Sequence, residues 1–267
     1  EDGSMREERI GTVYAVGFGP GDECYETMEA REVLAGVDVI VGYRTYAKIL
    51  QEQFPEKPFL ISGMREEEAR CREALTLAKE GKNVAVVSSG DSAVYGMAGL
   101  LYTLSEESAY AGVQVVTVPG LSAVLSGSAV LGAPVGHDFC VISLSDLLTP
   151  WEKIARRLKA AAEADFVIVL YNPLSRTRKT PFQEACRILS ETLPPDRVCA
   201  YVRNIGRDGQ TSRIFLLNEL ASLGERAEID MLSTIFIGNR ETRVVETPNG
   251  PRMVTPRGYE RKHAEES

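Results

Sequence analysis

The sequence lacks the patterns that mark several common enzyme classes. It contains only two histidines, His137 and His263, and no cysteine–histidine cluster with the spacing of a structural zinc site. It has neither a GxSxG nucleophile elbow nor the lysine of a Walker phosphate loop. The usual hydrolase and kinase signatures are therefore absent, and no metal site is expected.

Paired cysteines and long apolar runs are also missing. The five cysteines lie far apart, form no CxxC pair and are odd in number, which predicts reduced thiols and a cytoplasmic protein. The most apolar segments are short or broken by Gly and Ser, and no signal peptide precedes the first predicted strand, so no membrane span is expected. Glu1 to Ser4, which precede Met5, are interpreted as residues left from cloning.

An excess of basic residues is absent too. The 30 Lys and Arg residues are outnumbered by 38 Asp and Glu, and the net charge of -8 argues against nucleic acid as the main partner. With 267 residues, the chain can form one large domain or two small ones around a substantial core.

Strand and helix patterns alternate along the chain, which predicts an α/β fold. Residues 10–118 are expected to form a domain with a mostly parallel sheet, and Pro119 and Gly120 mark its boundary with a second domain over 119–240. Two neighbouring strands near the end of that domain, 198–202 and 213–217, have no helix between them, so its sheet is expected to be mixed. Residues 241–267 are predicted to be a tail that is partly disordered at its end.

The stretch VAVVSSGDSAVYG, residues 84–96, combines a buried strand with a tight polar loop. In open α/β sheets, ligands bind outside the carboxyl ends of the strands, where Asp91 would stand. The alternative is an ordinary strand-to-helix turn with Asp91 as the helix N-cap and a helix starting near Tyr95.

A second glycine-rich loop, GFGPGD at residues 17–22, follows the first predicted strand. Such a loop can hold a phosphate. Here Pro20 removes a backbone N–H, Asp22 adds negative charge, and the last glycine of the dinucleotide pattern is missing. Phosphate binding is therefore the less favoured interpretation.

Arginines are conspicuous at predicted strand ends and loops of the second half of this acidic chain. Guanidinium groups suit carboxylates, so they favour a polycarboxylate substrate, although surface solubility charges are the alternative. The segment YNPLSRTR places Asn172 and Arg176 after a hydrophobic strand. His137, beside Asp138 at a strand entry, is either structural or catalytic. The arginines are Arg176, Arg178, Arg203, Arg207 and Arg213.

Several motifs resemble those of the tetrapyrrole methylases. They occur in the family's order, as GFGPGD, SSGDSAVYG, VPGLSA, ISLSDLLTPW and LYNPLSRTR. The last two, with GHDF before them and DMLSTIFIGN after them, are most similar to the family's enzymes that methylate C17 of precorrin-3B in cobalamin biosynthesis. The resemblance extends from about Gly11 to Tyr259.

This resemblance implies two α/β domains with a cleft between them that binds S-adenosylmethionine (SAM), in a homodimer. The glycine-rich loop after the first strand would face the tetrapyrrole. Ser89 and Ser92 replace a Gly and a Pro of the family's middle motif, but Gly90 and Asp91 remain. The implied SAM contacts are Pro20, Gly90, Asp91, Val94, Ser122, Ala123, Asn172 and the backbone near Ile205 and Gly206.

The implied chemistry is methyl transfer with ring contraction. The sulfonium methyl is already activated and the macrocycle supplies the carbon nucleophile, so the enzyme mainly aligns the two and excludes water. Ring contraction also needs proton transfer. Candidates are Asp22, Tyr43, His137, Asp138, Ser145 and Asp146, and the predicted substrate contacts are Tyr43, Arg44, Arg176 and Arg178.

Three alternatives remain open at this point. The first is a family member that methylates another precorrin carbon, uroporphyrinogen III or a protein-bound diphthine precursor. The second is a nucleotide-binding oxidoreductase that uses the GFGPGD loop, and the third is a tetrapyrrole carrier without catalytic activity. Both metal-free and cobalt-containing substrates fit the sequence, and without a cysteine-rich extension no iron–sulfur cluster is expected.

Overall fold

The structure is a computed structural model that describes residues 8–63 and 66–266. The chain divides into an N-terminal unit, Glu1–Ser122, and a C-terminal unit, Ala123–Ser267. The division lies four residues after the predicted boundary at residue 118. The residues attributed to cloning lie outside the described residues.

The N-terminal unit contains a five-stranded sheet in the order β3-β2-β4-β1-β5. All neighbouring strands are parallel, which confirms the mostly parallel sheet predicted for this part of the chain. Because parallel strands need crossovers, a helix or loop connects each strand to the next. The strands are β1 (Thr12–Gly17), β2 (Val39–Tyr43), β3 (Phe59–Ser62), β4 (Val84–Ser88) and β5 (Gln114–Val118).

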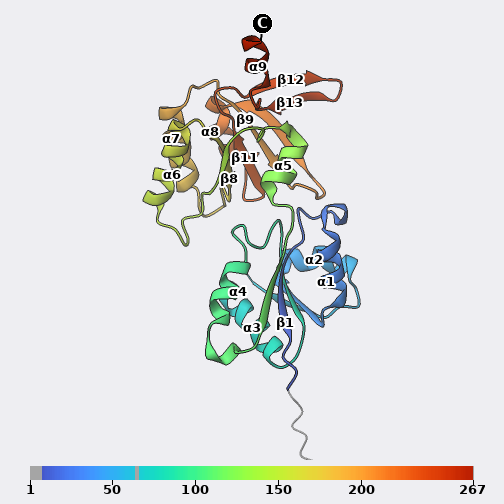
Figure 1. Cartoon of the computed structure of the whole chain (residues 1–267). Helices are drawn as coiled ribbons and strands as arrows, with labels where there is room; N and C mark the ends of the chain where they lie inside the picture. The colour runs from blue at the N-terminus through green and yellow to red at the C-terminus, as the bar shows by residue number, and fades with distance from the viewer. Residues whose placement is uncertain (1–7, 64–65, 267) are drawn as a thin grey trace, which may run out of the picture. The chain divides into compact units, whose positions relative to one another are not determined.

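Helices cover both faces of this sheet (Figure 1). One face packs against α1 (Met28–Gly36) and α2 (Arg44–Gln53), and the other against α3 (Glu67–Lys79) and α4 (Ala98–Ser105). The central strand β4 is buried on both sides, which explains its unbroken run of small and β-branched residues. The loops after the neighbouring strands β1 and β4 therefore lead to opposite faces, which is the arrangement at which α/β sheets bind ligands.

Helix α4 begins at Ala98, three residues after the predicted start at Tyr95. Tyr95 has a left-handed backbone with φ of 53°, which a right-handed helix cannot include. A Cβ on Gly96 would meet the backbone of Ser92, so this loop is folded tightly on itself. The N-cap of α4 is Met97, and the alternative interpretation of Asp91 as its N-cap is wrong.

The C-terminal unit contains a second five-stranded sheet in the order β10-β9-β11-β8-β7. Strands β7 and β8 are parallel, whereas the pairs β8–β11, β11–β9 and β9–β10 are antiparallel, which confirms the predicted mixed sheet. Strands β7, β8 and β9 consequently point in the same direction. The strands are β7 (Phe139–Ser143), β8 (Val167–Tyr171), β9 (Val198–Arg203), β10 (Thr211–Leu216) and β11 (Ser233–Ile237).

This sheet also separates two cores. On one side, α6 (Trp151–Glu163), α7 (Thr180–Thr192) and α8 (Leu220–Glu225) enclose the larger core. On the other side, α5 (Ala123–Leu131) packs on the sheet, and a Cβ on its Gly127 would come within 3.1 Å of the Phe236 ring. The small residues of α5 therefore allow a close helix–sheet approach.

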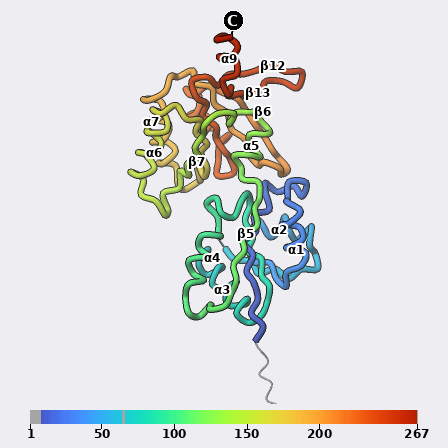
Figure 2. Tube along the Cα trace, in the orientation of Figure 1, coloured from blue at the N-terminus to red at the C-terminus, as the bar shows by residue number. Residues whose placement is uncertain are grey.

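The C-terminal segment is more ordered than the sequence suggests. Strands β12 (Arg243–Thr247) and β13 (Gly250–Val254) form a hairpin, and β13 also pairs with β6 (Gly132–Ala133), as Figure 2 shows. Met253 is fully buried in the core beside α5, and a short helix, α9 (Tyr259–Glu265), follows. The tail predicted from residue 241 thus contains a strand, β13, that is central in its sheet and pairs with residues far earlier in the chain.

Candidate functional site

The carboxyl end of the parallel sheet gathers the predicted functional residues of the N-terminal unit. Each of the loops concerned follows a strand of the same direction, so all of them emerge at one edge. The residues at this edge are Pro20, Asp22, Tyr43, Arg44, Gly90, Asp91, Val94 and Ser122.

The two glycine-rich loops of this edge bind each other. The amide of Gly19 donates to the Gly90 carbonyl at 3.1 Å, and the amide of Gly90 donates to the Gly19 carbonyl at 2.8 Å. The amide of Phe18 donates to the Ser88 carbonyl. A phosphate cradle needs free backbone N–H groups, and these three are already used. The geometry therefore disfavours the phosphate-binding interpretation of the GFGPGD loop.

Asp91 connects two strand ends. Its Oδ1 accepts a hydrogen bond from the amide of Gly120, which follows β5, and its Oδ2 accepts one from the amide of Ala93, both at 2.9 Å. Aspartate oxygens have further acceptor capacity, so a ligand can still be bound. A Cβ on Gly90 would lie 3.6 Å from the Cα of Ser122, which places these two predicted cofactor contacts side by side.

Two serines that sequence reasoning did not use complete this edge. Ser92 is fully buried, and its Oγ donates to the carbonyl of Ala15 in β1 at 3.0 Å. Ser88, the last residue of β4, has a buried Oγ without a hydrogen-bond partner in the described part of the chain. A buried hydroxyl left unpaired costs about 1–3 kcal/mol, so a polar ligand would be favoured there.

The predicted acid–base and substrate residues of this unit lie near the same loops. Asp22 is exposed, and its carboxylate caps the amide of Cys24 at 2.9 Å. This backbone hydrogen bond stabilises the carboxylate form and lowers the pKa of Asp22. The ring of Tyr43 packs edge-on against Tyr46, which in turn contacts Phe18.

A corresponding edge exists in the C-terminal unit, where β7, β8 and β9 end. Ser145 and Asp146 follow β7, Asn172 follows β8, and Gly206 follows β9. Val124, beside Ala123 at the start of α5, donates its amide to the Tyr171 hydroxyl at 2.7 Å. The remaining residues at this end are Arg176 and Arg178, in the loop after β8.

Asn172 has a defined geometry. Its backbone is left-handed, with φ of 50°, a conformation that asparagine tolerates better than most residues. Its Nδ2 donates to the Oγ of Ser143 at 3.0 Å. Its Oδ1 accepts no hydrogen bond from residues 8–63 or 66–266, so this exposed oxygen can receive one from a ligand. The amide of Gly206, in contrast, already donates to Gln210 Oε1 at 2.8 Å.

The arginines of this unit have different environments. Arg203 pairs with Asp230 at 3.0 Å, and Arg213 pairs with Glu228 at 3.0 Å, so both have local carboxylate partners. Arg178 donates to two backbone carbonyls. Arg176 is exposed and has no ion pair or hydrogen bond with the residues that the structure describes. Of these four, Arg176 is therefore the one whose guanidinium is available to a ligand.

His137 and Asp138 lie at the other end of this sheet. They precede β7, whereas Ser145 and Asp146 follow it, and a five-residue strand separates the pairs by about 17 Å. His137 Nδ1 lies 2.8 Å from the Asp138 amide, and its Nε2 lies 3.4 Å from Arg257. The pair His137 and Asp138 therefore cannot act on the same reacting atom as the pair Ser145 and Asp146. The geometry favours the structural interpretation of His137.

Comparison with known proteins identifies the family. The family model described as Tetrapyrrole (Corrin/Porphyrin) Methylases matches residues 12–221. The chain belongs to the tetrapyrrole methylase family. The resemblance of its motifs is thereby confirmed.

Named relatives of this methylase are similar over most of its length. The chain is 44% identical over 250 residues to a probable cobalt-factor III C(17)-methyltransferase of Methanocaldococcus jannaschii, covering 92% of this chain and 97% of that one. It is 43% identical over 256 residues to a cobalt-factor III methyltransferase of Priestia megaterium, covering 95% of this chain but only 46% of that longer protein. A crystal structure of the methyltransferase CobJ matches with a TM-score of 0.82 and 36% identity, covering 92% of this chain and all of that one.

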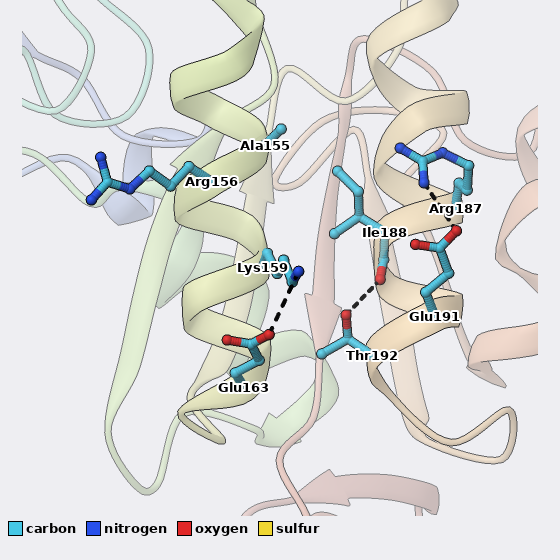
Figure 3. A pocket seen from close by; sticks show the side chains of 8 residues that line it. All are labelled: Ala155, Arg156, Lys159, Glu163, Arg187, Ile188, Glu191 and Thr192. Atoms are coloured by element: carbon cyan, nitrogen blue, oxygen red, sulfur yellow. Dashed lines mark hydrogen bonds and ion pairs between the residues drawn. The ribbon is translucent and has the colours of Figure 1, made fainter.

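A groove between α6 and α7 of the methylase contains none of the predicted residues (Figure 3). It has a volume of about 850 Å³ and is lined mainly by charged side chains. Lys159 faces Glu163 at 3.9 Å, and Arg187 pairs with Glu191 at 2.9 Å. Neighbours on the same helix neutralise these four charges.

No helix in the described part of this methylase is both long enough and apolar enough to cross a bilayer.

The site residues that sequence reasoning missed, Ser88, Ser143 and Tyr171, all end strands. Their position at the carboxyl end of a strand was the available signal.

Proposed function

We propose that this chain transfers a methyl group from SAM to C17 of precorrin-3B or cobalt-factor III, with ring contraction, in cobalamin biosynthesis. The observation that carries the proposal is the 44% identity to a probable C17-methyltransferase over 97% of that relative's length. The alignment extends well beyond the family's cofactor motifs, over 92% of this chain.

The residues at the two strand edges fit SAM. In the N-terminal unit, Gly90 lies beside Ser122, and Ser88 supplies a buried hydroxyl without a hydrogen-bond partner among the described residues. In the C-terminal unit, the Asn172 carboxamide oxygen accepts no hydrogen bond from the described residues. Cofactor contacts are proposed for Pro20, Gly90, Asp91, Val94, Ser122, Ala123, Asn172 and Gly206. For Gly206, the contact would be through its carbonyl, because its amide already binds Gln210.

SAM supplies an activated methyl group, so the protein needs no strong nucleophile of its own. The proposed task of Asp91 and Asn172 is to hold the donor in one orientation, because productive alignment alone lowers a barrier by several kcal/mol, up to about 10. For the proton transfers of ring contraction we propose Asp22, with Ser145 and Asp146 at the edge of the other unit. His137 and Asp138 are not included, since they lie at the opposite end of their sheet.

Carboxylate side chains of the substrate need cationic partners. Arg44, the first residue of α2 directly after β2, and Arg176, in the loop after β8, are both exposed, and each is proposed to bind an acetate or propionate group. Tyr43 would contact the macrocycle beside Arg44. Arg203 and Arg213 are not proposed, because Asp230 and Glu228 already neutralise them.

The test is an anaerobic incubation of the protein with methyl-labelled SAM and either cobalt-factor III or precorrin-3B, followed by mass spectrometry. Transfer of one methyl group to either substrate is expected, and the preferred substrate distinguishes the cobalt-containing from the metal-free pathway. If SAM binds but neither substrate is methylated, a family member with another tetrapyrrole target replaces this proposal. Tight NADH binding without SAM binding would instead favour the oxidoreductase alternative, and tetrapyrrole binding without SAM consumption the carrier.

We further propose a homodimer in the cytoplasm. The dimer is expected from the family resemblance and is tested by light scattering of the purified protein.

None of the five cysteines forms a disulfide, and burial raises the pKa of the Cys71 and Cys186 thiols to about 12, which keeps them unreactive in a reducing compartment. Cell fractionation tests the compartment.

A further inference from the structure

The ends of β7 and β8 are joined by one side chain from the loop that follows β8. Ser143 and Tyr171 are register partners, and the amide of Leu144 donates to the Tyr171 carbonyl at 2.9 Å. The carbonyls of the following residues, Leu144 and Asn172, lie beyond the strand ends and have no partner in the β7–β8 ladder. Arg178 donates to both, from Nη1 to Leu144 O at 3.2 Å and from Nη2 to Asn172 O at 3.1 Å.

The Arg178 guanidinium is committed to the backbone. Two of its N–H groups point to two neighbouring carbonyls, a geometry that the planar guanidinium fork matches and the single ammonium of lysine does not. No carboxylate of the described residues lies within ion-pair distance of Arg178. The loop that carries it is also tight, since the amide of Arg178 donates to Ser175 Oγ and the amide of Ser175 donates to Arg178 O.

Arg178 contacts Asn172, a residue whose backbone conformation must be stabilised by its surroundings. Asn172 is left-handed, and such a conformation persists when its surroundings impose it. On the side-chain side, its Nδ2 is held by Ser143 Oγ, which also accepts from the amide of Ser145 at 3.3 Å. On the backbone side, its carbonyl is held by Arg178. These contacts together orient the exposed carboxamide oxygen.

We propose that Arg178 is a positioning residue that orients Asn172 toward the cofactor, and that it does not bind a substrate carboxylate. This reassigns Arg178, which the sequence analysis placed among the substrate contacts. The inference rests on the proposed use of SAM. Arg176, only two residues away, is exposed and without such contacts, so the two arginines of one motif have different functions.

Matched variants separate these functions. Arg178→Lys, Arg178→Ala and Arg176→Ala are compared with the wild-type full chain for the dissociation constant of S-adenosylhomocysteine, by calorimetry, and for the tetrapyrrole KM at saturating SAM. Arg178→Ala is expected to weaken S-adenosylhomocysteine about tenfold and to change KM less than twofold. Arg178→Lys, which can still reach one carbonyl, is expected to recover part of the affinity. Arg176→Ala is expected to raise KM and to leave the dissociation constant unchanged.

A double-variant cycle tests whether Arg178 acts through Asn172. If it does, Asn172→Ala combined with Arg178→Ala binds S-adenosylhomocysteine no more weakly than Asn172→Ala alone, whereas independent contacts give multiplied losses. Hydrogen exchange of residues 143–146 and 172–178 provides a readout that does not need the cofactor, and Arg178→Lys is expected to increase exchange in both segments.

Two results would overturn the inference: a raised KM with unchanged affinity in the Arg178 variants, or multiplied losses in the cycle. If Arg178→Ala does not fold, Arg178→Lys decides the same points. Lack of S-adenosylhomocysteine binding by the wild type would instead overturn the proposed function, and hydrogen exchange would then decide whether Arg178 holds the two strand ends.

Discussion

Replacing Asp91 tests whether its carboxylate both joins two loops and supports the cofactor. The carboxylate accepts two hydrogen bonds, from Gly120 N and Ala93 N, each at 2.9 Å. Hydrogen bonds to charged groups contribute about 1.5–3 kcal/mol each. The Ala93 amide is exposed and regains water, whereas the Gly120 amide is partly buried. For Asp91→Ala we therefore expect a loss of about 2 kcal/mol in the free energy of unfolding.

Asp91→Asn tests the same two roles with a smaller change. An asparagine keeps one acceptor oxygen and therefore one of the two hydrogen bonds, so we expect a loss of about 1 kcal/mol. For a unit of this size, about 1 kcal/mol corresponds to roughly 4 °C in Tm. Both variants are expected to remain folded at 25 °C, and both are expected to bind SAM more weakly than the wild type.

Thermal unfolding and calorimetric titration with S-adenosylhomocysteine measure the two effects on the same samples. Far-UV circular dichroism at 25 °C checks that each variant is folded before titration. A Tm for Asp91→Ala within 1 °C of the wild type would refute the loop-joining argument, at about 4 °C per kcal/mol. Unchanged affinity in both variants would remove Asp91 from the cofactor site.

Three further substitutions probe other parts of the molecule. Arg176→Ala is expected to raise the tetrapyrrole KM about tenfold in steady-state assays; an effect confined to SAM binding would contradict its proposed role. Gly120→Ala places a Cβ against the carbonyl oxygens of Gly90 and Gly17, so a loss of about 3 kcal/mol or more is expected in urea unfolding, and a wild-type midpoint would contradict this packing. Glu26→Gln removes a carboxylate whose pKa is raised by burial, although its Oε2 pairs with Arg31 at 3.4 Å; its Oε1, like Gln53 Oε1, lacks a partner among the described residues. Because the penalty for charging Glu26 develops as pH rises through its raised pKa, the Tm of the variant relative to the wild type should be higher at pH 7.5 than at pH 4.5; an equal difference at both pH values would refute this.

The edges where ligands are expected could be predicted from local sequence. The run Val84–Ser88 is apolar because β4 is covered on both faces, and the break at Gly90 and Asp91 marks its carboxyl end. The missing helix between β9 and β10 indicated an antiparallel pair for the same local reason: a short connection cannot cross over. These features depend on neighbours in the chain, which a sequence displays directly.

The partners of individual side chains could not be predicted in this way. Nothing in LYNPLSRTR distinguishes Arg176 from Arg178, yet only Arg178 reaches the carbonyls after two strands. His137 and Ser145 are eight positions apart in the sequence, but a strand places them at opposite ends of a sheet. The pairing of β13 with Gly132 and Ala133, more than a hundred residues earlier, is likewise not visible in the local sequence.

The sequence by itself determined the alternation of strands and helices, the mixed second sheet and the family, since periodicity, turn residues and motif order are properties of the chain alone. The tertiary structure decided which groups are available: Asp91 is bound to Gly120, Arg203 to Asp230, and the Gly19 and Gly90 amides to each other's carbonyls. The physical reason is that hydrogen bonds and ion pairs depend on distances of about 3 Å between residues far apart in the chain, and only packing sets those distances.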